Sequence, residues 1–110
     1  MNPAISHNQN IRWLILVIIY AQRANGATES GGWLREDLLR RLLAAEGYPL
    51  SVEELRIYCD YLEDQTIACL EKKRLGDPIH PDCKYRLTAK GMRAATREER
   101  VIGIGVSGNE

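Results

Sequence analysis

The stretch from Ser51 to Gly91 constrains the fold most strongly, because its hydrophobic period changes from helical to alternating and back. Ser51 and Glu54 form a capping box ahead of apolar residues at helical spacing, which predicts a helix. Two short apolar-rich runs typical of strands follow, and Thr88 then caps a helix predicted to end near Arg100. The expected strands are Ile67–Lys72 and Lys84–Leu87, with a turn at Gly76–Pro78. This order predicts a mixed α+β domain.

The preceding half of the chain predicts two helices. The first is expected from Asn8 to Ala24, after a loose N-terminus at residues 1–7. A very short strand is expected at Trp33–Leu34, and the second helix should end near Glu46, before Gly47 and Pro49. A chain of 110 residues then makes one domain over residues 1–100. The tail, residues 101–110, is expected to be flexible or strand-like.

The first helix is apolar nearly all round, so it needs cover on more than one side. In so small a domain a second subunit can supply part of that cover, which predicts a homodimer. The residues expected at this interface are Trp13, Leu16, Val17 and Tyr20. Inside the last helix, Gly91 costs about 1 kcal/mol relative to alanine, so backbone is expected to pack closely against it.

The net charge is zero, but the charges are segregated along the chain. Residues 26–71 carry ten acids and four bases, whereas residues 72–100 carry nine bases and four acids. No global positive field therefore attracts polyanions. Affinity for DNA would have to come from local clustering of bases.

The segment YRLTAKG at Tyr85–Gly91 resembles the end of the wing in winged helix-turn-helix proteins, PadR-like and MarR-like regulators among them. The segment LRIYCDYLEDQTIACLEK, Leu55–Lys72, resembles their recognition helix running into the wing, although Thr66 stands where those families usually have glycine. A fainter similarity is to small winged-helix proteins of Mu-like prophages. The resemblance implies a mostly helical α+β fold with a two- or three-stranded wing. It also implies a cytoplasmic DNA-binding protein that regulates transcription.

The charges of the expected third helix argue against simple insertion into the major groove, because its outward side carries five acids and only Arg56 as a base. We therefore expect DNA backbone contacts mainly through the wing, with help from the second helix. The candidate DNA-binding residues are Arg35, Arg40, Arg41, Arg56, Lys72, Lys73, Arg74, Lys84 and Arg86. The alternative is an adaptor whose acidic third helix binds a protein. Its candidate contact residues are Ile57, Asp60, Tyr61 and Asp64.

Catalysis and metal binding have little support in the sequence. No nucleophile–base arrangement or phosphate-loop motif is present, so we expect no catalytic residue and no enzymatic activity. Cys69 and Cys83 are expected to be cross-strand neighbours, and with His80 they could bind zinc. Packing of Cys69 as a small apolar residue is the better interpretation, so no metal or cofactor is expected.

The cysteines number three and include no CxxC pair, which favours a reduced, cytoplasmic protein with free thiols. The most apolar run, Trp13–Ala21, is far shorter than the roughly 20 residues that a membrane span needs. We therefore expect no membrane association.

Overall fold

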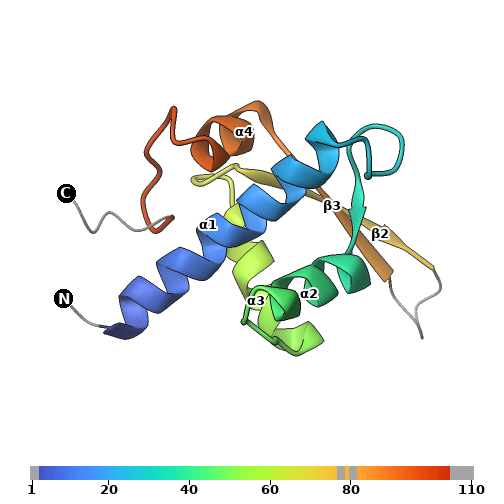
Figure 1. Ribbon diagram of the computed structural model, residues 1–110, viewed down its shortest axis with the longest axis horizontal. Helices are drawn as coiled ribbons and strands as arrows, with labels where there is room; N and C mark the ends of the chain where they lie inside the picture. The colour runs from blue at the N-terminus through green and yellow to red at the C-terminus, as the bar shows by residue number, and fades with distance from the viewer. Residues whose placement is uncertain (1–2, 77–78, 80–81, 105–110) are drawn as a thin grey trace.

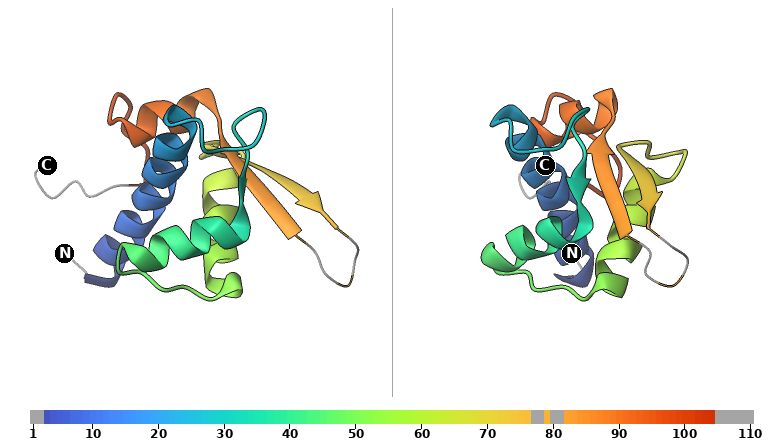
Figure 2. Two further views of the ribbon diagram at one scale, coloured as in Figure 1. Left: turned by 45° about the vertical axis from the view of Figure 1, so that its right-hand side comes forward. Right: turned by 90° about the vertical axis from the view of Figure 1, so that its right-hand side faces the viewer.

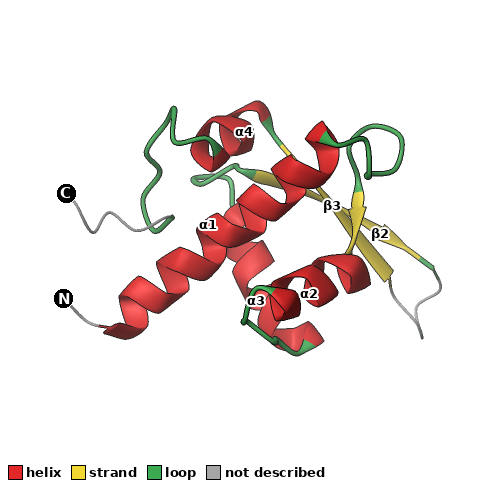
Figure 3. Cartoon of the chain, viewed as in Figure 1, coloured by secondary structure: helices red, strands yellow, loops and turns green. Residues whose placement is uncertain are grey.

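A computed structural model describes residues 3–76, 79 and 82–104. The described chain folds into helices packed on a small antiparallel sheet (Figures 1 and 3). The elements in chain order are α1 (Pro3–Ala24), β1 (Leu34–Arg35), α2 (Glu36–Ala45), α3 (Val52–Glu63), β2 (Leu70–Leu75), β3 (Asp82–Leu87) and α4 (Ala89–Ala95). The predicted α+β class is confirmed, and the arrangement is compatible with a winged helix-turn-helix. In the described part no helix is both long and apolar enough to cross a membrane.

The sheet has three antiparallel strands in the order β1-β3-β2. On its inner face Tyr85 of β3 lies between Leu34 of β1 and Lys72 of β2, and Leu70 lies opposite Leu87. The apolar residues of this face are buried in the core. The β2–β3 hairpin projects away from the helices (Figure 2). This hairpin is the wing, and its outer face is open to solvent.

The core is built around α1, which packs against α2, α3, α4 and β3. Val101 and Ile104, which follow α4, also pack on this core. The cover that the apolar α1 needs is therefore supplied largely by the chain itself.

This packing corrects the predicted dimer interface. Leu16 is fully buried in the domain, so it cannot contact a partner, and Val17 packs partly buried against the core. The Arg97 guanidinium lies 4.4 Å from the centre of a Trp13 ring. Of the four residues only Tyr20 is classed as exposed.

Both predicted helix caps are confirmed. Ser51 Oγ accepts from the Glu54 amide at 3.1 Å, and the Glu54 carboxylate accepts from the Ser51 amide at 2.9 Å. Thr88 Oγ1 accepts from the Gly91 amide at 3.0 Å. Gly91 also meets backbone as expected, because a Cβ there would overlap the carbonyl of Cys69.

Several predicted boundaries are wrong by a few residues. Helix α1 begins at Pro3 rather than Asn8, because proline fits the first turn of a helix, where its missing N–H is not needed. Strand β2 begins at Leu70 rather than Ile67, since Ala68 takes a left-handed conformation (φ 53°) that no strand accommodates.

The C-terminal elements differ from the prediction as well. Strand β3 begins two residues earlier than expected, at Asp82. Helix α4 ends at Ala95 rather than near Arg100, because the Thr96 hydroxyl donates back to the Met92 carbonyl and Arg97 has φ 64°.

Cys69 and Cys83 are not cross-strand neighbours. Cys83 lies opposite Arg74, whereas Cys69 precedes β2 and its carbonyl accepts from the Thr88 amide. Cys69 is thus level with Thr88 rather than with Cys83. His80, the turn residues 77–78 and the tail residues 105–110 lie outside the described residues. Within the described residues, no three His, Cys, Asp or Glu side chains gather to hold a metal ion.

Candidate nucleic-acid interface

A row of three cations crosses the outer face of the sheet. Arg35 of β1 is paired with Lys84 of β3, and Lys84 is paired with Lys73 of β2. Residues directly opposite each other share a face. Because the neighbouring Leu34 and Tyr85 point into the core, these three basic side chains point outward. The row is therefore a property of the strand register.

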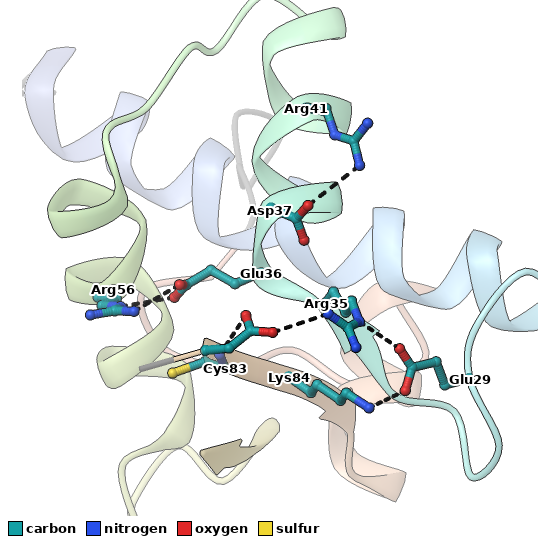
Figure 4. A network of polar contacts seen from close by, with 9 residues as sticks. Glu29, Arg35, Glu36, Asp37, Arg41, Arg56, Cys83 and Lys84 are labelled. Carbon is teal, nitrogen blue, oxygen red and sulfur yellow. Dashed lines mark hydrogen bonds and ion pairs between the residues drawn. The ribbon is translucent and has the colours of Figure 1, made fainter. Parts of the chain in front are cut away.

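Glu29, in the loop between α1 and β1, bridges two members of the row (Figure 4). One carboxylate oxygen accepts from Arg35 Nε at 2.9 Å and the other contacts Lys84 Nζ. Arg35 also pairs with Asp82, Nη1 to Oδ2, at 3.2 Å. The hydrogen bond from Lys84, followed by that from Arg35, lowers the pKa of Glu29 below its usual value.

A tryptophan adjoins the row on the same side of the molecule. The Arg86 guanidinium lies 4.6 Å from the centre of a Trp33 ring, and the Lys73 ammonium lies 5.9 Å from it. Arg86 also donates to Glu71, the residue opposite it on β2, at 2.9 and 3.1 Å. These contacts hold Arg86 flat against the sheet.

Two predicted DNA-binding residues, Lys73 and Arg74, are exposed on β2 and have no carboxylate partner among the described residues. No carboxylate in the described part of the chain neutralises the charge of these two side chains. Lys73 lies on the outer face with Lys84, whereas Arg74 lies opposite the buried Cys83 and so points to the other face of the sheet. Lys73 is therefore the member of the row that no described carboxylate neutralises.

Arg56, another predicted DNA-binding residue, serves a different role. It donates through Nε and Nη2 to both oxygens of Glu36, at 2.9 Å each, and Tyr85 Oη donates to the same carboxylate at 3.0 Å. Glu36 is only 5% exposed. The pKa of Arg56 is raised, chiefly by its hydrogen bonds to Glu36. This cluster fastens α2, α3 and β3 together, and Glu36 pairs with Arg56 rather than with Arg40, its neighbour at the i+4 position on α2.

The other predicted cations are also engaged within the chain. Lys72 lies 3.3 Å from an Asp60 oxygen and 3.5 Å from a Glu63 oxygen, which ties β2 to α3. Arg40 donates to the Leu50 carbonyl at 3.2 Å. Arg41 pairs with Asp37, four residues before it on α2, at 3.5 Å. Arg40, Arg41 and Asp37 line an open pocket beside the turn between α2 and α3.

The outward face of α3 is acidic with one aliphatic side chain. Ile57 is 69% exposed, and one helical turn away on the same face lie Glu53, Glu54 and Asp60. The predicted contact residue Asp64 caps the end of α3, where its carboxylate accepts from the Thr66 amide at 2.9 Å. Ile57 is therefore the only large aliphatic residue exposed on this helix.

Tyr61 is covered by the chain itself, which reduces its value as a contact residue. Its hydroxyl donates to the Ile102 carbonyl at 2.9 Å, and the Arg12 guanidinium stacks 3.8 Å from its ring centre. Arg12 donates in turn to the Gly103 carbonyl at 3.0 Å. We define residues 101–104 as the C-terminal strap, because they lie across α1 and α3.

Sequence reasoning missed Glu29, Trp33 and Glu36 as members of these clusters. Glu29 and Trp33 belong to or border a glycine-rich loop, whose composition indicates flexibility and hides its contacts. Glu36 lies four residues before Arg40, and the local spacing rule pairs those two first. No sequence signal sets Glu36 apart from exposed glutamates, because its partners Arg56 and Tyr85 reach it only in the folded domain.

No protein-family model matches the chain, and no curated protein matches it in sequence. The arrangement of strands and helices does not by itself specify a ligand. Any function must be argued from the geometry of the sheet face and of α3.

Proposed function

We propose that the protein is a non-enzymatic DNA-binding protein that holds the phosphate backbone with the outer face of its wing sheet. The observation that carries this proposal is the row Arg35–Lys84–Lys73. Like charges directly opposite one another destabilise a sheet, so the row does nothing for folding by itself. With strands about 4.8 Å apart, it spans roughly 10 Å, and an anionic strand laid across it would relieve the repulsion.

Helix α3 is not the reading element in this proposal. Together with Asp64 it carries one base and five acids, so a duplex laid along it would meet excess negative charge. Phosphate neutralisation by Lys and Arg dominates DNA affinity. The sheet face has the favourable balance, with four cations and three acids. They are Arg35, Lys73, Lys84 and Arg86, opposed by Glu29, Glu71 and Asp82.

Backbone contacts position a protein on DNA without specifying sequence. The expected binding is therefore weakly sequence-dependent and falls steeply as salt rises. Trp33 adds an aromatic surface beside the row, but Arg86 already covers it. Base stacking is not part of the proposal.

The test is fluorescence anisotropy of a mixed-sequence duplex at low and moderate salt. Changing Lys73 to Ala should weaken binding and reduce the slope of log K against log salt by about 1, since each phosphate contact contributes about 0.9. The matched control changes Lys90 of α4 to Ala, which removes the same charge elsewhere. Absence of binding at low salt, or equal losses in both variants, would contradict the proposal.

A second candidate is protein docking through α3, favoured by the exposure of Ile57 among carboxylates. The partner would present an apolar pocket with a basic rim. Changing Ile57 to Ala should abolish capture of such a partner in a pull-down. Ile102→Ala is the control, because Ile102 is also a highly exposed isoleucine but lies on the C-terminal strap. Equal capture by both variants would exclude docking through Ile57.

A further inference from the structure

The cation row already holds an anion, and that anion belongs to the protein. Glu29 places one oxygen against Arg35 and the other against Lys84, as two oxygens of a phosphodiester would. Lys84 lies on the open face of the sheet, yet only 16% of its side chain is exposed, while the Glu29 side chain over it is 42% exposed. The part of the row nearest β1 is thus masked by a loop carboxylate.

We propose that Glu29 occupies a phosphate position on the sheet and acts as an internal counter-anion that the DNA backbone displaces. This inference rests on the proposed function and adds its regulation. Arg35 and Lys84 form the phosphate position that Glu29 masks, and Lys73 is the unmasked cation next to them.

The loop is built so that the carboxylate can leave while the backbone stays. The Glu29 amide donates to the Trp33 carbonyl at 2.8 Å, and the Gly32 amide donates to the Glu29 carbonyl at 3.0 Å. These bonds close a tight turn that anchors the Glu29 backbone on the molecule. Because the side chain is exposed, rotation about its own bonds brings the carboxylate into water without unfolding the turn.

The exchange is energetically accessible. Exposed ion pairs contribute little to folding stability, because both partners are well solvated when apart. A single dissolved anion gains no more binding free energy from Arg35 and Lys84 than the Glu29 carboxylate does. A duplex carries a dense array of phosphates that engage Lys73 at the same time. The mask should therefore favour polyanions over small anions.

The experiment is Glu29→Gln, which keeps the size of the side chain and removes its charge. Anisotropy with the same duplex should show binding about 10-fold tighter than wild type at low salt, because no carboxylate has to be displaced. The salt slope should stay close to the wild-type value, because the bound duplex contacts Arg35 and Lys84 in both proteins. The matched control is Glu99→Gln, which frees Arg93 from an exposed ion pair beyond α4. That control makes the same change in net charge and should leave binding near the wild-type value.

A double variant assigns the gain to the proposed position. Adding Lys84→Gln to Glu29→Gln should cancel most of the gain. If wild-type binding depends on Lys73 but Glu29→Gln binds no better than wild type, the internal counter-anion is wrong and the proposed function stands. If neither wild type nor Glu29→Gln binds DNA at low salt, the proposed function itself fails. Equal gains in DNA affinity in Glu29→Gln and Glu99→Gln would show that the effect comes from net charge alone. That result would overturn the inference.

Discussion

Two glutamates of this domain each hold two partners, and the difference between them lies in burial. Glu36 holds Arg56 and Tyr85 at the junction of α2, α3 and β3, and it is 5% exposed. Glu29 holds Arg35 and Lys84 on the open sheet face, where its side chain is 42% exposed. The chemistry of the contacts is similar. We infer that the first carboxylate is structural and that the second is exchangeable.

The largest expected effect comes from breaking the buried cluster. Glu36→Gln should destabilise the domain by about 2 kcal/mol, because Arg56 loses its charged partner in a poorly solvated place. Arg56 is 35% exposed, which keeps the loss below that of a fully buried pair. Urea unfolding at pH 7 measures it. A loss of unfolding free energy as small as that expected for Glu29→Gln would contradict the distinction between a structural Glu36 and an exchangeable Glu29.

An intermediate effect is expected at alkaline pH, and it too comes from the buried region. Burial raises the pKa of the Cys59 thiol above its ordinary value of 9.0, and that of the Tyr85 hydroxyl above 10.0. In the unfolded chain these groups ionise at their ordinary values. The contribution of these two protonated groups to the free energy of unfolding should therefore be fully present below pH 9. The free energy of unfolding should fall as pH rises above 9, by up to about 1.4 kcal/mol per pH unit for each group.

Urea midpoints at pH 7, 9 and 10 test this slope. Cys59→Ala should reduce the alkaline loss while lowering stability at pH 7 by leaving a small cavity. A midpoint that does not change between pH 8 and 10 would show that these groups are not shielded from water.

The smallest expected effect is that of Glu29→Gln on folding. Its urea midpoint at pH 7 should lie close to the wild-type value, since the pairs it breaks are exposed. The lowered pKa of Glu29 has one consequence for stability: its contribution is present above pH 4.5 and is lost as pH falls through the folded-state pKa. The variant should therefore lose less stability than wild type between pH 5 and 3. Identical acid profiles would show that the bridge to Arg35 and Lys84 is not formed in solution.

Local patterns predicted much of the fold. The caps at Ser51 and Thr88 depend on residues three positions apart, and both form as expected. The close approach at Gly91 followed from the cost of glycine in a helix. The pairing of Cys69 with Cys83 failed, because the β2–β3 register places Cys83 opposite Arg74 and leaves Cys69 level with Thr88.

The candidate site was less predictable, because it depends on which residues share a face. The sequence identifies the cations of the wing, but only the register places Arg35, Lys84 and Lys73 in one row. The need for cover on α1 was correctly recognised from its apolar surface. Its source was not, since Val101 lies far along the chain and touches α1 only after folding.

The C-terminal strap has a consequence for the order in which the domain closes. The bond from Arg12 to Gly103 joins residues 91 positions apart, so the first helix meets this partner among the last parts of the described chain to be synthesised. Contacts so distant in sequence form slowly, because a long loop must close first. During synthesis at the ribosome, the Tyr61 side of the domain stays uncovered until the strap emerges. A nascent chain therefore presents an aromatic side chain that the finished protein partly covers.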